Sequence, residues 1–212
     1  MTRRPFPHRP RKELQVTRPT LVERRSEELR LTVARAARDI FLADGDTSAT
    51  IERICDTAGI AVRTFHRHFA VKEDVVMPLF RLYGNLSVQV LRDAAPDSDT
   101  CETLVRAFSA EVSKRGELDI DRRFMALMIN NPQYRLRWLD WGQDMVDPVT
   151  EFLATRVHLD EDPFARAVPA HLVIQISRQA YIHWAEGGDF DHLESALRAG
   201  IHIVMRALSR LP

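Results

Sequence analysis

The chain has 212 residues, of which 45% are hydrophobic and 28% charged, and its 30 Lys and Arg balance its 30 Asp and Glu. This composition is ordinary for a globular protein, no apolar run reaches the ~20 residues that span a bilayer, and a net charge of zero argues against a protein coated in nucleic acid. Two cysteines are too few for a disulfide framework, and no apolar signal segment opens the chain, so we expect a reduced, cytoplasmic setting.

The first 20 residues predict a flexible basic arm. They contain four prolines and six Lys or Arg against one Glu, and such a segment buries little surface. An arm of this kind can follow phosphates or enter a minor groove, or it can be an extension without contacts. Residues 1–74 hold 15 Lys and Arg against 11 acids, a balance of +4, whereas residues 75–212 hold 15 against 19, a balance of −4.

Residues 22–43 predict the first helix, because apolar side chains recur along one face from Leu29 to Phe41. Gly45 is expected to end this helix, and the hydroxyl of Thr50 is expected to cap the next one.

Residues 50–72, TIERICDTAGIAVRTFHRHFAVK, predict two short helices joined by a tight turn. The first has an apolar face at spacings of three and four, and Gly59 follows it in a position suited to the left-handed conformation. The second directs Phe65 and Phe69 inward and leaves its other face to donors and cations. This pattern is typical of a helix-turn-helix that reads nucleic acid.

The remaining chain predicts six further helices, because no stretch alternates like a strand. We expect Pro78 to kink the first of them and Pro148 to disturb the long fourth one. The prediction is an all-α protein of nine helices, with a helix-turn-helix domain over 21–71 and a helical ligand-binding and dimerisation domain over 72–212. The six expected helices cover 72–95, 100–116, 119–130, 132–158, 163–186 and 190–210.

The last two helices predict a homodimer interface, because both carry apolar residues beyond a single buried stripe. Two helices from each subunit would form an isologous four-helix contact. Ordinary packing within one chain is the alternative. The expected interface residues are Leu172, Ile176, Trp184, Leu193, Leu197, Ile201, Val204 and Leu208.

Aromatic residues and methionines in the second domain predict an apolar ligand cavity, because such side chains form adaptable pocket walls. The alternative is a solid core. The expected lining residues are Tyr83, Phe108, Met125, Met128, Trp138, Trp141, Met145 and Phe152.

We expect no metal, no cofactor and no enzymatic activity. The eight histidines include no chelating pair at i and i+4, and the chain has no G-x-S-x-G, Walker, G-x-G-x-x-G or C-x-x-C motif. A helical enzyme or metal-binding bundle would need titratable residues that converge in the second domain, and none stand out in the sequence.

The motif resembles the DNA-binding domain of tetracycline-repressor-type (TetR family) transcriptional regulators. The resemblance covers about residues 22–75, and beyond them only the helix count, the length and the final helix pair agree. The matching positions are Gly45, Thr50, Ile54, Ala58, Gly59, Ile60, Phe65, Phe69, Lys72 and Glu73.

The resemblance implies that residues 62–68 form a recognition helix in the major groove. Arg63 and Thr64 would then meet base edges, and Arg67 could serve bases or phosphates. The residues expected to meet the phosphate backbone are Thr50, His66, His68 and Lys72.

Three positions depart from the family pattern. Ala61 and Val71 replace the usual polar helix caps, and each lost cap costs about 1 kcal/mol. His66 replaces a tyrosine that usually contacts phosphate. These changes leave open which atoms of the motif touch DNA.

The resemblance also implies a homodimeric repressor on a pseudo-palindromic operator, released by a small, largely apolar ligand. Pro78 is a candidate point for transmitting the signal. A repressor of the same fold that senses nothing is the alternative, with residues 138–152 forming solid core.

Overall fold

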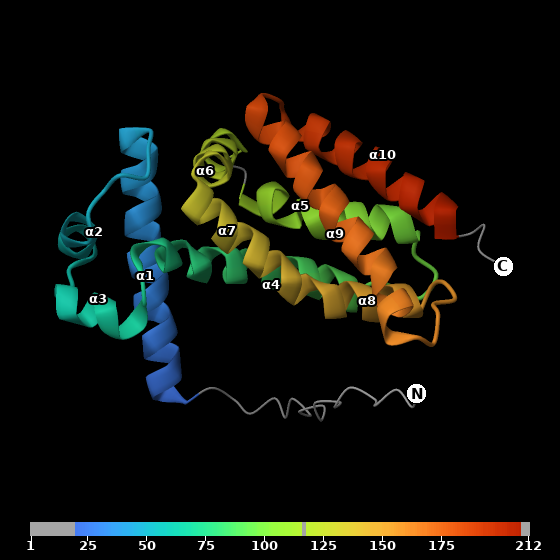
Figure 1. Cartoon of the computed structure of the whole chain (residues 1–212), viewed down its shortest axis with the longest axis horizontal. Coiled ribbons are helices and arrows are strands. Elements are labelled where there is room, and N and C mark those ends of the chain that lie inside the picture. Colours follow the sequence, from blue (N-terminus) through green and yellow to red (C-terminus); the bar gives the residue numbers. More distant parts are fainter. Residues whose placement is uncertain (1–19, 116–117, 209–212) are drawn as a thin grey trace, which may run out of the picture.

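The computed structural model describes residues 20–115 and 118–208. Across these two ranges every regular element is a helix, which confirms the predicted all-α class. Figure 1 shows two parts, which we call the head (residues 20–76) and the body (residues 77–208). The predicted basic arm falls, except for Thr20, outside the described residues.

The head contains α1 to α3 and a short 3-10 helix, and the body contains α4 to α10. The rod formed by α7, η2 and α8 bends but does not separate, so counting it as one helix gives the predicted nine over the described part of the chain. The elements are α1 (Leu21–Asp44), α2 (Ile51–Ala58), α3 (Val62–His68), η1 (Lys72–Val76), α4 (Met77–Arg92), α5 (Thr100–Arg115), α6 (Leu118–Asn130), α7 (Pro132–Trp141), η2 (Gly142–Met145), α8 (Val146–Ala154), α9 (Pro163–Glu186) and α10 (Phe190–Leu208).

Local sequence signals set the helix boundaries of the head. Thr20 and Glu23 form a reciprocal capping box at the start of α1. Gly45 and Gly59 end α1 and α2 in the left-handed region, with φ of 73° and 67°. The Thr50 hydroxyl accepts from the Arg53 amide at 3.2 Å. The predicted cap at Thr50 and the predicted stops at Gly45 and Gly59 are therefore confirmed, whereas the capping box at Thr20 was not predicted.

Proline positions in the body differ from the prediction. Residues 72–76 form the separate helix η1, so Pro78 lies in the first turn of α4. A backbone N–H in the first turn of a helix has no partner within the helix, so the proline costs no hydrogen bond there. The expected kink inside a continuous helix 72–95 is therefore wrong. The long helix 132–158 is interrupted at Gly142–Met145, before Pro148, which lies in the first turn of α8.

One continuous hydrophobic core joins head and body. Phe41 of α1 is fully buried, and its ring packs edge-on against Tyr134 of α7, with centroids 5.5 Å apart. A rigid contact of this kind lets the position of α7 affect α1.

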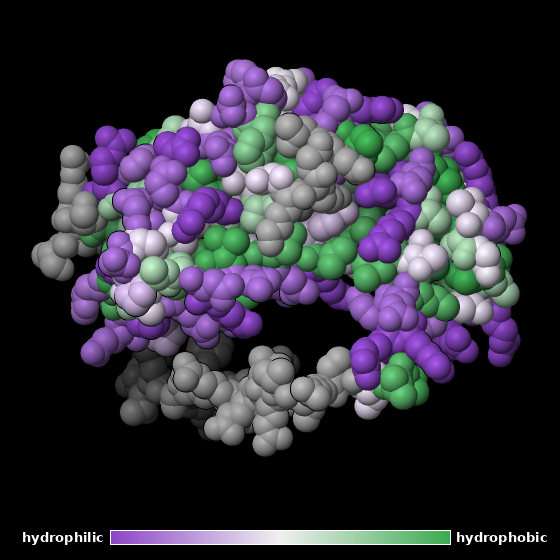
Figure 2. All heavy atoms as spheres, turned by 180° about the vertical axis from the view of Figure 1, so that it is seen from behind, coloured by the Kyte–Doolittle hydropathy of each residue, from purple (hydrophilic) through white to green (hydrophobic). Residues whose placement is uncertain are grey.

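The surface is mixed in polarity. Seen from behind, a band of hydrophobic atoms crosses the middle of the molecule, with hydrophilic side chains above and below it (Figure 2). Over the described ranges no helix combines the length and apolarity needed to cross a membrane.

Candidate nucleic-acid interface and cavity

Helix α3 is held by two aromatic side chains on its inner face. Phe65 is fully buried and Phe69 is nearly so, and the centroids of their rings lie 4.9 Å apart. Because α3 has only two turns, this anchoring fixes which side chains face outward. Arg63, His66 and Arg67 are exposed on the free face, where the recognition surface was predicted.

The other predicted contact residues of the motif are only partly available. Thr64 is half-buried, and the Thr50 hydroxyl already accepts from the backbone. His68 turns toward α1, where its Nδ1 lies 3.4 Å from the Ser26 hydroxyl. Burial, followed by the charges of Arg30 and Arg67, lowers the pKa of His68.

Lys72 is the first residue of η1, and its side chain reaches the loop between α1 and α2. Its ammonium donates to the carbonyl oxygens of Thr47 at 3.1 Å and Ala49 at 3.2 Å. An ammonium group has three donors, so one remains for a phosphate. Its DNA contact stays a prediction, and its bonds to the loop before α2 are a structural role that the sequence did not indicate.

The two unusual cap positions differ in the structure. Ala61 provides no side-chain cap to α3. At Val71, however, the Asp74 carboxylate accepts from the backbone amide at 3.3 Å, so part of the lost capping is replaced from within η1.

Three polar contacts between head and body were not predicted. Asn131 donates to the Thr47 hydroxyl at 2.8 Å, and Arg123 donates to the Leu42 carbonyl at 3.0 Å. Arg137 of α7 forms an ion pair with Asp74 at 2.7 Å. No local pattern marks such residues, because their partners lie far away in the chain.

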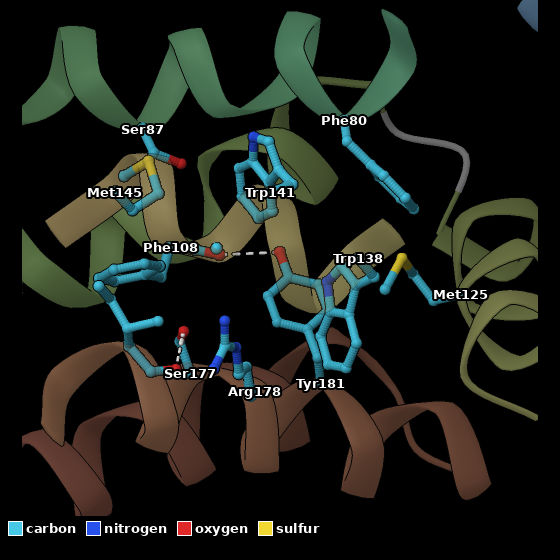
Figure 3. Close-up of a pocket in the computed structure, with 12 residues that line it drawn as sticks. Phe80, Ser87, Phe108, Met125, Trp138, Trp141, Met145, Ser177, Arg178 and Tyr181 are labelled. Carbon is cyan, nitrogen blue, oxygen red and sulfur yellow. Dashed lines mark hydrogen bonds between the residues drawn. The ribbon is translucent and has the colours of Figure 1, made fainter. Parts of the chain in front are cut away.

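The body encloses a small, mainly apolar cavity between α4, α5, α6, α7 and α9, with a volume of about 30 Å³ (Figure 3). The structure brings several predicted residues together around it, and their role toward a ligand stays a prediction. They are Phe108, Met125, Trp138, Trp141 and Met145.

The other predicted lining residues lie elsewhere. Met128 is fully buried in the core, and Tyr83 of α4 interacts with Arg38 of α1. Phe152 lines a more open hollow on the body, where the Arg156 guanidinium lies 5.1 Å from its ring centroid. These positions correct the predicted lining, because helix periodicity does not reveal which neighbour a buried face meets.

Sequence reasoning missed the polar residues that α9 contributes to the cavity. The Tyr181 hydroxyl donates to the Phe108 carbonyl, and the Ser177 hydroxyl donates to the Ile174 carbonyl, both at 2.8 Å. Arg178 points into the cavity between them (Figure 3). The spacing of Ile174, Arg178 and Tyr181 at i, i+4 and i+7 was the available signal, since it places a cation in an apolar stripe.

Most of the predicted dimer residues belong to the core of a single chain. Trp184, Leu193, Leu197, Ile201 and Val204 are already buried within the single chain, so they have little surface left for a partner subunit, and the dimer interface stays a prediction. Their stripe packs α10 onto α5 and α9. Leu172 is 47% exposed, Ile203 is 62% exposed, and Ile176 and Leu208 are half-buried.

Within the described ranges, His, Cys, Asp and Glu do not gather into any group of three or more that could hold a metal ion.

Two family models match the chain. The one described as "Bacterial regulatory proteins, tetR family" covers residues 34–77, and "MftR C-terminal domain" covers residues 98–209. Most of the head and most of the body are therefore matched.

Three known proteins illustrate the similarity. The transcriptional regulator TcmR of Streptomyces glaucescens is 27% identical over 153 residues, 68% of each chain. The transcriptional repressor AcnR of Corynebacterium diphtheriae is 26% identical over 182 residues, 79% of this chain and 87% of the repressor. The repressor FadR of Thermus thermophilus, solved with lauroyl-CoA, has a TM-score of 0.59 at 21% identity, covering 83% of this chain and 93% of its own.

Proposed function

Because the chain belongs to the TetR family of bacterial transcriptional regulators, we propose that it is a homodimeric repressor released from its operator by a small, largely apolar ligand. The observation that carries the proposal is the outward face of α3, which presents Arg63, His66 and Arg67 to solvent on a helix anchored by Phe65. We assign it a cytoplasmic location, with the DNA, and no enzymatic activity.

The exposed side of α3 would enter the major groove. Arg63 can pair bidentately with a guanine, and Thr64 can meet a thymine methyl group. His66, Arg67 and Lys72 would then contact phosphates and set the register of the head on the duplex. Thr50 and His68 retain a supporting role, because both already have partners within the head.

A dimer would place two such heads on one operator, with α3 helices about 34–36 Å apart. The outer faces of α9 and α10 are the proposed contact. Leu172 and Ile203 are large, exposed apolar side chains on these faces. We add Ile203 to the predicted residues Leu172, Ile176 and Leu208, which also keep exposed surface.

Helix α7 offers a physical link between ligand and DNA. Its first turns reach the head through Asn131, Tyr134 and Arg137, whereas Trp138 and Trp141 line the cavity. A ligand that shifts the tryptophans would move the same rod that holds the head. By linkage, ligand and operator would then weaken each other's binding.

A repressor without a ligand is a second candidate, and the small cavity volume favours it. About 30 Å³ holds roughly one water molecule, so a ligand must displace side chains. The two candidates differ in thermal unfolding, since any ligand that binds the native protein raises its melting temperature.

The experiment that tests DNA recognition starts from fragments selected out of genomic DNA with the intact protein. Arg63→Ala should lose about 1–3 kcal/mol on the selected site and relax the preference at one base pair. Lys72→Ala should weaken selected and random DNA alike and flatten the salt dependence. Arg92→Ala, an exposed arginine of α4, is the matched control and should change neither. Equal losses on selected and random DNA for Arg63→Ala would contradict the assignment.

A further inference from the structure

Arg178 is a cation placed in an apolar cavity. It lies on the inner face of α9, one turn from Ile174 and from Tyr181, and its side chain points toward Phe108 and Trp141 (Figure 3). Its Nη2 donates to the Leu139 carbonyl at 2.6 Å, whereas its buried Nε has no hydrogen-bond partner. The guanidinium therefore has donors to spare inside the protein.

No carboxylate balances this charge at the cavity wall. The described residues that line the cavity are aromatic, aliphatic, methionine, serine, glycine and tyrosine, with Arg178 as the charged group. Burial lowers the pKa of Arg178, and none of the described residues that line the cavity is an acid. An arginine nevertheless stays protonated in a protein. The Arg178 side chain is half-buried, and its buried Nε has no hydrogen-bond partner to offset the loss of water.

The surrounding backbone makes room for the guanidinium. A Cβ atom at Gly142 would lie only 2.5 Å from Nη2 of Arg178. Gly142 is the first residue of η2, the break between α7 and α8. The Leu139 carbonyl, which accepts from Arg178, lies in the last turn of α7. A carbonyl is a weaker partner for a guanidinium than a carboxylate.

We propose that the cavity binds an amphipathic anion, with its carboxylate paired to Arg178 and its apolar part between Trp138, Trp141 and Met145. The proposal deepens the ligand response above and rests on it for its biological meaning. Ser87 adds a hydroxyl that faces the cavity from α4 (Figure 3). A guanidinium already holding Leu139 can form further charge-assisted bonds through its free N–H groups.

Entry of such a molecule requires the cavity to expand, and Trp141 is one of the side chains that would have to move. An added Cβ at Gly84 would lie 2.4 Å from the Trp141 ring, so the indole is packed tightly onto α4. Displacing it would move α7, the rod that contacts the head. Anion binding and release from the operator are thereby joined in one element.

The test uses tryptophan fluorescence of the full chain without DNA, titrated with three probes of equal chain length: decanoate, 1-decanol and decyltrimethylammonium. Trp138 and Trp141 line the cavity and report occupancy. Decanoate should bind at least tenfold more tightly than decanol, and the cation should bind most weakly. Equal binding of decanoate and decanol to the unaltered protein overturns the proposal, and this comparison needs no variant to fold.

Variants then assign the selectivity to one residue. Arg178→Met should abolish the preference for decanoate while keeping the affinity for decanol, and Arg178→Lys should retain part of it. Arg156→Met is the matched control, because Arg156 is also a half-buried arginine of the body that donates to carbonyls but lies outside this cavity. If Arg178→Met keeps the preference, Arg178 only caps the end of α7 and the proposal fails.

Gel-shift measurements on a selected DNA fragment separate this proposal from the proposed function. Decanoate binding that depends on Arg178, in a protein without sequence-specific DNA binding, would overturn the repressor and leave the anion site standing. If the protein binds DNA specifically and decanol and decanoate release it equally, the repressor proposal stands and the anion site is overturned.

Discussion

The head and the body use the same residue type for different physical reasons, as Gly59 and Gly142 illustrate. Gly59 ends α2 with φ of 67° and has open space where a Cβ would lie. Gly142 has an ordinary φ of −60°, but a Cβ there would meet the Arg178 guanidinium. Gly59 in the head is required by the local backbone conformation. Gly142 in the body is required by a side chain that is distant in the sequence.

The largest expected effect tests whether the two parts unfold separately. Phe65→Ala removes the anchor of α3 and should cost about 3–5 kcal/mol. All tryptophans lie in the body, at 138, 141 and 184. Helix melting followed by circular dichroism should therefore begin at a lower temperature than the change in tryptophan fluorescence, and specific DNA binding should be lost.

Met128→Ala is the matched control in the body core, and it should lower the tryptophan transition instead. If Phe65→Ala lowers both transitions equally, head and body unfold as one unit.

Exchanging the two glycines tests their contrast directly. Gly142→Ala should cost about 1–3 kcal/mol through crowding against Arg178, and Gly59→Ala about 1–2 kcal/mol through the left-handed conformation. Asn tolerates that conformation, so Gly59→Asn should recover stability where Gly142→Asn does not. Urea unfolding of the four variants provides the measurement, and recovery at position 142 would refute the spatial explanation.

The contact between the parts should have a smaller effect. Thr47→Val removes the hydroxyl that accepts from Asn131 and leaves the cap of α7 intact, at a cost of about 0.5–1.5 kcal/mol. The circular dichroism and fluorescence transitions should then separate further than in the unaltered protein. Thr57→Val, an exposed threonine of α2, should leave their separation unchanged.

The smallest expected effect is the pH response of the head. The pKa of His68 is lower in the folded chain than in the unfolded one, so its contribution to stability is present above about pH 6.5 and is lost as pH falls through the folded value. The melting temperature of His68→Gln should fall less than that of the unaltered protein between pH 7.5 and pH 5.5. His66→Gln, on the exposed face, is the control, and an equal fall in all three proteins would contradict the role of His68.

The sequence alone determined the all-α class, the caps of the head and the inward and outward faces of α3. Thr50, Gly45, Gly59 and Phe65 act through partners within a few residues, so local spacing is sufficient to identify them.

Only the tertiary structure decided the features of the body that concern a ligand. Leu193 and Leu197 have the same periodicity whether they face a partner subunit or α5 and α9 of their own chain, and the structure buries both within the single chain. The spacing of Arg178 with its neighbours places a cation in an apolar stripe, but only its contacts with Gly142 and Leu139, about 40 positions earlier in the chain, show that this stripe borders a cavity. Helical spacing indicates that one face of a helix is buried. Only the packing of distant segments shows which part of the protein buries it.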